Sequence, residues 1–89
     1  ISIGTNSFRG CSSLKSIELP SSLDFIGIGA FGNCTQLQSA KLSDGLESIG
    51  SWAFSYCPKL SEIQLPKTLT ELGSAAFYEC SSLSHIVIS

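Results

Sequence analysis

The stretch CSSLKSIELPSSLDFIGIGAFGN, residues 11–33, decides the fold because the chain repeats it. The next 23 residues read CTQLQSAKLSDGLESIGSWAFSY (34–56), and those after them read CPKLSEIQLPKTLTELGSAAFYE (57–79). Residues 1–10, ISIGTNSFRG, match the end of such a unit, and residues 80–89, CSSLSHIVIS, match its beginning. A fixed period of about 20–50 residues is typical of proteins whose units stack on one another. The sequence therefore predicts one array over residues 1–89, with three full units and two partial ones, as part of a longer array.

Equivalent positions of the units hold the same kind of residue. One aromatic set and one thiol set recur at intervals of 23 residues: Phe8, Phe31, Phe54 and Phe77, and Cys11, Cys34, Cys57 and Cys80. One leucine set and one glycine set recur in the same way: Leu14, Leu37, Leu60 and Leu83, and Gly4, Gly27, Gly50 and Gly73. We expect each apolar set to form a ladder of side chains in a common core.

The spacing L-x-x-I-x-L within each unit, as in Leu14, Ile17 and Leu19, is typical of leucine-rich repeats. The alternation I-x-L predicts half-buried strands, and strands of successive units should stack in parallel. The Ala-Phe pair of each unit, as in Ala30 and Phe31, predicts one short helical turn with its apolar side inward. The predicted fold is a leucine-rich-repeat solenoid: a right-handed superhelix with a parallel β-sheet on one face and short strands, turns and single helical turns elsewhere.

The full unit, L-x-x-I-x-L-P-x-x-L-x-x-I-G-x-x-A-F-x-x-C, closely resembles the BspA-like leucine-rich repeats over all 89 residues. Few 23-residue repeats combine the proline after the strand, the Ile-Gly pair and the Ala-Phe-x-x-Cys segment. The chain departs from this pattern at four positions: Ser7, Ala40, Ser43 and Leu72. The resemblance implies a cell-surface or secreted protein in which the repeat array mediates adhesion and protein binding.

Composition and charge exclude several other classes. The net charge is −2 and 13% of the residues are charged, so no basic face indicates nucleic-acid binding. No apolar run approaches the roughly 18–20 residues that span a bilayer, so we expect no direct membrane span. The expected partners are a protein or glycan ligand and the neighbouring repeats of the same chain.

The four cysteines have two further interpretations besides core packing. Zinc sites usually pair their ligands as C-x-x-C, which this chain lacks, so we predict no metal site and no cofactor. Equivalent residues of a parallel ladder lie about 4.7–4.9 Å apart, and disulfides tolerate that separation, so oxidation remains open. We favour buried free thiols, because cysteine packs well as a small apolar residue.

Candidate catalytic groups are isolated. Ser12 and Lys15 match S-x-x-K, a nucleophile motif, but its companion motifs are missing and Ser12 belongs to the repeat pattern. His85 is the only histidine and no second basic group backs it. We therefore predict no catalytic residues and no enzyme.

The x positions of the predicted strands point away from the core. They form two files on the strand face: Ser16, Ser39, Glu62 and His85, and Glu18, Lys41, Gln64 and Val87. Such a face is the usual docking surface of curved solenoids, although each residue singly could be solvated surface only. A second, weaker candidate is an aromatic patch of Trp52, Tyr56 and Tyr78, where the other repeats lack aromatics. Packing between repeats would explain these rings about as well.

Asn33 begins an N-x-T sequon at a variable position, so we expect its side chain to be exposed; it would carry a glycan only in a secreted eukaryotic protein. The favoured function is a protein-interaction module, adhesin-like by the resemblance. The alternatives are a structural spacer that holds other modules apart and, less well supported, a non-catalytic part of an enzyme.

Overall fold

The computed structural model describes residues 2–42 and 44–88, so the departure from the repeat pattern at Ser43 lies outside the described residues. Eight short strands occur in this part of the chain: β1 (Ser2–Ile3), β2 (Ser16–Glu18), β3 (Phe25–Ile26), β4 (Ser39–Lys41), β5 (Ser48–Ile49), β6 (Glu62–Leu65), β7 (Glu71–Leu72) and β8 (His85–Ile88). The strands predicted from the I-x-L alternation are β2, β4, β6 and β8, and they are confirmed.

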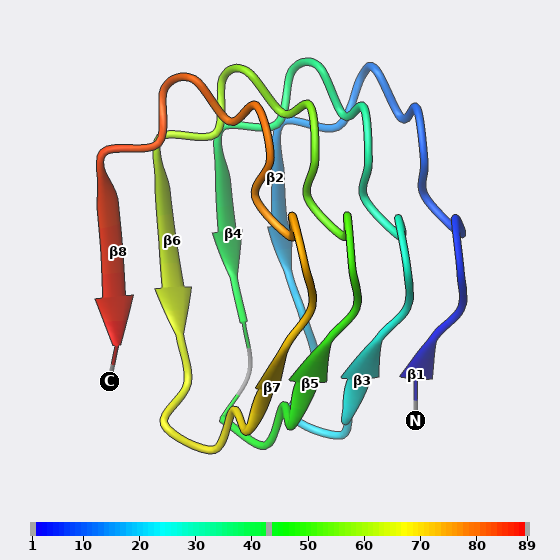
Figure 1. Ribbon diagram of the computed structural model, residues 1–89, viewed down its shortest axis with the longest axis vertical. Coiled ribbons are helices and arrows are strands. Elements are labelled where there is room, and N and C mark those ends of the chain that lie inside the picture. The colour runs from blue at the N-terminus through cyan, green and yellow to red at the C-terminus, as the bar shows by residue number, and fades with distance from the viewer. Residues whose placement is uncertain (1, 43, 89) are drawn as a thin grey trace.

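The strands form two parallel sheets, which face each other across the interior of a right-handed coil (Figure 1). One sheet has the order β2-β4-β6-β8 and the other has the order β1-β3-β5-β7. Each pair of neighbours is in register at 23 residues, so that Ile17 lies beside Ala40 and Ile26 lies beside Ile49. The sequence repeat is therefore one full turn of the coil.

The segment around each Ala-Phe pair differs from the prediction. No helix occurs in the described residues, and segment 28–33 consists of consecutive turns in which Ala30 and Gly32 donate to carbonyls three residues back, at 3.2 and 3.0 Å. The amide of Phe31 donates instead to Ala53 O of the next repeat, at 2.7 Å. A helical turn would need that amide for its own repeat. The single helical turns are thus replaced by turns that extend the ladder between repeats.

The glycine of each Ile-Gly pair is required by the close approach of the neighbouring repeat. A Cβ added to Gly27 would lie 2.6 Å from the backbone carbon of Gly4, and one added to Gly50 would lie 2.7 Å from that of Gly27. Only a residue without a side chain lets two repeats approach this closely.

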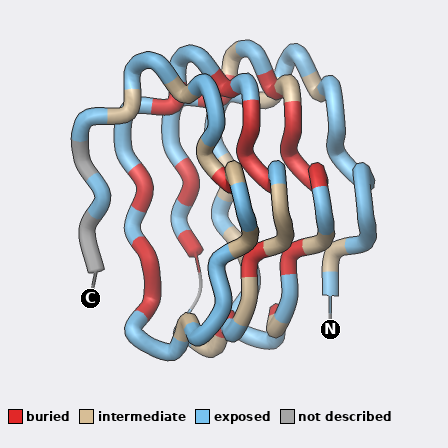
Figure 2. Tube along the Cα trace, viewed as in Figure 1, coloured by how far each residue is buried: buried red, intermediate tan, exposed pale blue. Residues whose placement is uncertain are grey.

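The core lies between the two sheets and the turns, and Figure 2 shows that its buried residues are concentrated in the central repeats. The phenylalanines form one stack, with ring centroids 5.2 Å apart from Phe8 to Phe31, 5.2 Å from Phe31 to Phe54 and 5.7 Å from Phe54 to Phe77. Ala40 is buried between Ile17 and Ile63, so the small residue keeps its place in the core file.

Both end layers of the described array expose members of the same core files. Phe8, in the first layer, is 43% exposed, whereas Phe31 is only 2% exposed. An apolar hollow of about 310 Å³ opens at the N-terminal end and is lined mainly by Ile3, Phe8, Leu14, Ile17, Leu19, Pro20 and Phe31. Each unit therefore completes its burial only where another unit covers it.

The buried phenylalanine stack gives the first testable prediction. Phe54 is fully buried, so Phe54→Ala should cost about 3–5 kcal/mol through lost burial and the cavity left behind. We expect its thermal midpoint to fall by more than about 10 °C, or the chain to unfold altogether. Phe25→Ala is the matched control, because Phe25 is 47% exposed on β3. Equal midpoints for the two variants in a thermal melt followed by circular dichroism would contradict this assignment of the core.

Candidate functional site

The strand-face residues lie where the sequence places them, in two outward files on the sheet β2-β4-β6-β8. Ser16, Ser39 and Glu62 pair in register and are exposed, and so are Glu18, Lys41 and Gln64. His85 pairs with Glu62 and Val87 pairs with Gln64 along the backbone. The side chains of His85 and Val87 lie outside the described part of the structure.

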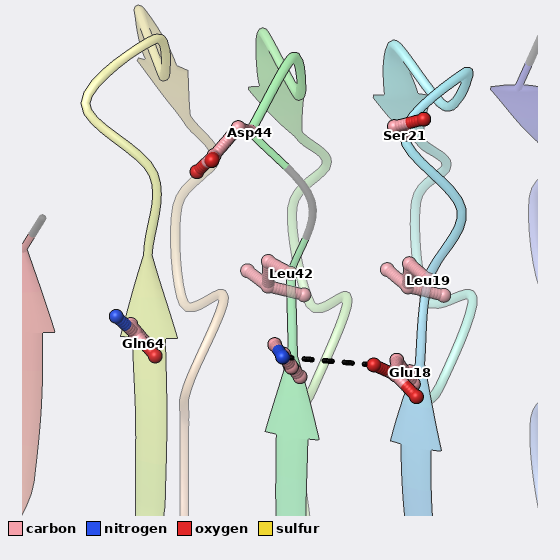
Figure 3. Close-up of a pocket in the computed structure, with 7 residues that line it drawn as sticks. Glu18, Leu19, Ser21, Leu42, Asp44 and Gln64 are labelled. Carbon is pink, nitrogen blue, oxygen red and sulfur yellow. Dashed lines mark ion pairs between the residues drawn. The ribbon is translucent and has the colours of Figure 1, made fainter.

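A shallow pocket of about 400 Å³ lies where this face meets the loops after the strands. Figure 3 shows Glu18 and Leu19 from β2 and the loop that follows it, Leu42 at the same level beside β4, and Gln64 on β6. Ser21 and Asp44 lie beyond them in the loops. The pocket thus joins an apolar floor to a polar rim.

An ion pair at this pocket joins the neighbouring strands β2 and β4. Lys41 Nζ lies 3.6 Å from Glu18 Oε2, and the two side chains are 71% and 75% exposed. Water screens a pair so exposed, so it adds little to stability. Both charged groups therefore remain accessible to a partner.

The aromatic patch is also brought together. The ring of Tyr78 meets that of Trp52 edge to face at 5.3 Å and that of Tyr56 edge to face at 5.6 Å. All three side chains are exposed, by 43% for Trp52, 43% for Tyr56 and 48% for Tyr78. Edge-to-face contacts are favourable geometries for aromatic pairs, so the patch is a packed cluster on the surface of the turns. Packing between repeats, the alternative interpretation, accounts for the contacts between the rings but does not explain why so much of the ring surface is exposed.

Two of the three aromatic residues have unusual backbone conformations. Trp52 has φ of 64° and Tyr56 has φ of 56°, in the left-handed region that residues with side chains rarely adopt. The equivalent residues of the preceding repeat are Gly29, with φ of 65°, and Asn33, with φ of 58°. The turn imposes this conformation on every repeat, and bulky rings are unfavourable occupants of it.

A hollow of about 200 Å³ adjoins the patch. It is lined by residues of three successive repeats: Arg9, Gly29, Gly32, Trp52, Ser55 and Tyr56. Ser55 is buried and its hydroxyl donates to Trp52 O at 3.0 Å, which fixes the wall on that side. We call these six residues the aromatic hollow.

The cysteine thiols donate hydrogen bonds that join successive repeats. Cys57 Sγ donates to Phe31 O at 3.3 Å, and Cys34 Sγ donates to Phe8 O at 3.4 Å. All four cysteines are free; Cys34 and Cys57 are buried as predicted, whereas Cys11 and Cys80 are half-buried. Burial raises the pKa of Cys34, and a hydrogen bond with Cys80 together with burial raises the pKa of Cys57 far above its usual value. Within the described residues, no group of three His, Cys, Asp or Glu side chains could hold a metal ion.

The sequon residue Asn33 is half-buried and not exposed as expected. Its backbone is left-handed, and its backbone N–H donates a hydrogen bond to Ser55 O of the next repeat, at 2.9 Å. The side chain is therefore only partly accessible from solvent.

Several residues that shape these sites escaped the sequence analysis. Leu19, Ser21, Leu42 and Asp44 follow the strands and were not assigned to the binding face. Gly29 and Gly32 line the aromatic hollow. The sequence offered a signal for them, because the equivalent positions of later repeats hold the aromatic residues Trp52 and Tyr78. Arg9 lies two repeats away from Trp52, so only the stacking of the coil shows that they share a hollow.

The stacked turns, the paired parallel sheets and the outward strand files define a leucine-rich-repeat solenoid. The sequence matches the BspA type leucine rich repeat region in six copies over residues 1–89, so the chain belongs to this family. The predicted family is confirmed. No helix long and apolar enough to cross a membrane occurs in the part of the chain that the structure describes.

Three solved structures are similar to this chain. A leucine-rich repeat protein from Bacteroides ovatus has 38% sequence identity and a TM-score of 0.94 over 97% of the chain. The T. pallidum leucine rich repeat protein has 33% identity and a TM-score of 0.79 over 97% of the chain. A leucine rich cell surface protein from Faecalibacterium prausnitzii has 28% identity and a TM-score of 0.75 over 99% of the chain.

The chain spans only 22%, 51% and 29% of the lengths of these three proteins, in the same order. A comparison with curated proteins gives no match.

The buried thiols give a prediction about reactivity. The thiolate is the reactive form, so burial and a raised pKa should slow the alkylation of Cys34 and Cys57 at neutral pH by at least about tenfold relative to the unfolded chain. The measurement is iodoacetamide labelling, read by mass spectrometry of peptides, with the chain unfolded in urea as the control. Labelling of Cys34 or Cys57 in the folded chain as fast as in urea would contradict the burial.

The same thiols give a prediction about pH. The folded-state pKa of Cys57 lies above its ordinary value of 9.0, so the folded chain holds this proton more tightly than the unfolded chain. The resulting stabilisation is fully present below pH 9.0 and is lost as the pH rises above it. The thermal midpoint should therefore fall between pH 9.0 and about 11 more steeply in the parent than in Cys57→Ser, which keeps a hydroxyl donor but does not ionise. Equal slopes for the two proteins would contradict the raised pKa.

Proposed function

We propose that the chain is a protein-binding module of a cell-surface or secreted protein, and that it contacts its partner through the outer face of the sheet β2-β4-β6-β8. This is an adhesin-like role, and the proposal assigns no catalytic step to the chain. The observation that carries it is the contrast between the two sides of this sheet.

The inner side of the sheet is nearly constant from repeat to repeat, whereas the outer side changes. Inward positions hold Ile17, Ala40 and Ile63, which pack in one core file. Outward positions change from serine to glutamate in one file and from glutamate to lysine to glutamine in the other. The fold does not need any particular residue at the outward positions, which leaves them free to fit a partner.

The pocket at the end of this face adds a place for an anchoring side chain. Its apolar floor includes Leu42, and its rim carries Glu18, Lys41 and Asp44. Binding hot spots are typically side chains that enter such a depression, surrounded by polar contacts. The name of the F. prausnitzii relative, a leucine rich cell surface protein, supports the proposed location.

The test uses charge reversal on the two sheets. We expect Lys41→Glu and Glu62→Lys, both on the strand face, to weaken binding at least about tenfold, because charges at an interface steer association and fix its register. Glu71→Lys makes the same change on β7 of the other sheet and should leave binding within about twofold. Surface plasmon resonance against a panel of immobilised serum and extracellular-matrix proteins provides the readout.

The competing role is a spacer that holds other modules apart. Binding that is equally insensitive to all three substitutions, or no binding to any member of the panel, would favour the spacer over the strand face.

A further inference from the structure

Packing between repeats accounts for the ring contacts of the aromatic patch but not for its exposed ring surfaces. Trp52 occupies a position that other repeats fill with Asn6, Gly29 and Ala75, and those repeats form the same turn. Tyr78 likewise replaces Gly32 and Ser55. The core files and the ladder between repeats are therefore complete without these rings.

The backbone at the patch argues in the same direction. The turn of every repeat adopts a positive φ at the positions of Trp52 and Tyr56, and a bulky residue there reduces the stability of the folded chain, so its presence indicates a role other than folding. Trp52 and Tyr56 both have positive φ, at 64° and 56°. Glycine, which the equivalent turn has at position 29, would occupy this conformation without strain.

The hollow beside the rings is also not required by the fold. A Cβ added to Gly32 would lie 3.4 Å from Gly29 O and 3.4 Å from Ser55 Oγ, which is ordinary van der Waals contact. A Cβ at position 32 is therefore tolerated, so the fold does not require glycine there. The hollow that Gly32 lines has a volume of about 200 Å³ and lies beside Trp52 and Tyr56.

The lining of the hollow restricts the class of ligand. Trp52 and Tyr56 line the hollow, and the face of an aromatic ring attracts the slightly positive C–H groups of a saturated ring. Arg9 brings a guanidinium with five N–H donors to the same hollow. Small-molecule sites typically combine an aromatic lining with a few polar groups in this way. A ring with an apolar face and an edge of hydroxyls fits both features.

A proline-rich peptide fits this geometry less well. Such a peptide docks along an extended groove lined by aromatic residues. Here the aromatic wall belongs to one compact cluster, with ring centroids 5.3 and 5.6 Å apart, and the hollow beside it has room for a single ring.

We propose that the aromatic hollow binds one pyranose ring of a saccharide, stacked on Trp52 and Tyr56 and hydrogen-bonded by Arg9. This site lies on the turns and is separate from the strand face, so it does not depend on the function proposed above. The shared chemistry is the pyranose ring; neutral and acidic sugars are distinguished by experiment.

The experiment exploits the single tryptophan of the chain, which lies in the site. The probes are methyl β-D-galactopyranoside, methyl β-D-glucopyranoside and methyl β-D-glucuronide, with a proline decapeptide as the competing ligand class. We expect a saturable change in Trp52 fluorescence and saturation-transfer NMR signals from at least one sugar, with a dissociation constant of about 1 mM, typical of so small a ligand. Binding of the glucuronide alone, abolished by Arg9→Ala, identifies an acidic sugar, and binding of a neutral glycoside identifies a neutral one.

Two substitutions test the site by different routes, with saturation-transfer NMR as the readout. Trp52→Gly removes the stacking surface and places glycine at a positive φ, so it should weaken binding at least about tenfold while the thermal midpoint stays within about 5 °C. Gly32→Leu places a side chain in the hollow and leaves Trp52 and Tyr56 unsubstituted, so it should weaken binding to the same degree. Glu71→Lys on β7 is the control and should bind the sugar as the parent does.

Three outcomes would overturn the proposal. The first is the absence of a saturable signal from all three sugars up to about 50 mM, well above the expected dissociation constant. The second is unchanged binding in both Trp52→Gly and Gly32→Leu, either of which suffices as a test if the other does not fold. The third is binding of the proline decapeptide in place of the sugars, which would assign the hollow to a peptide.

Discussion

The hydrogen bonds from one turn of the coil to the next are the interaction on which the rest of this structure depends. Beyond the strands, the amides of Asn6, Phe8 and Gly10 donate to the carbonyls of Ile28, Ala30 and Gly32 at 2.8–2.9 Å, and the following repeats keep the same pattern. This ladder holds successive turns at the spacing of neighbouring strands. Equivalent side chains of successive repeats must therefore stack on one another, which explains the phenylalanine stack. The same spacing requires glycine where the backbones of two repeats approach most closely.

The same ladder determines which positions are available for function. In each turn that another repeat follows, the residues two positions before and after the phenylalanine, such as Trp52 and Tyr56, donate their backbone amides to the next repeat and adopt left-handed conformations. The side chains of Trp52, Tyr56 and Tyr78 are exposed, as are those of Lys41 and Glu62 on the strands. Substitution there changes the surface without disturbing the core, so both candidate surfaces consist of residues on which the repeat places little demand.

Periodicity in the sequence predicted much of this, since a 23-residue period and an I-x-L alternation define both the stacking and the buried face. The pairing of Ile17 with Ala40 and the burial of Phe54 follow from them directly. The helical turn at Ala30 and Phe31 was wrong, because an apolar pair fits a helical turn and a β-turn equally well, and only the ladder decides which one forms. The sequence analysis also missed the aromatic hollow. The hollow is a space beside glycines, and a glycine such as Gly32 has no side chain that would suggest a binding site.

A binding site built across repeats has a property that a site within one repeat lacks. Arg9 belongs to the first partial unit, Gly29 and Gly32 to the next, and Trp52 and Tyr56 to the one after that. Their relative positions depend on the rotation from each repeat to the next, because no single unit contains the hollow. The strand-face pocket depends on the same rotation, since it takes residues from β2, β4 and β6 and from the loops that follow β2 and β4. Core substitutions that loosen the stacking should therefore weaken both surfaces together, even where they leave every lining residue in place.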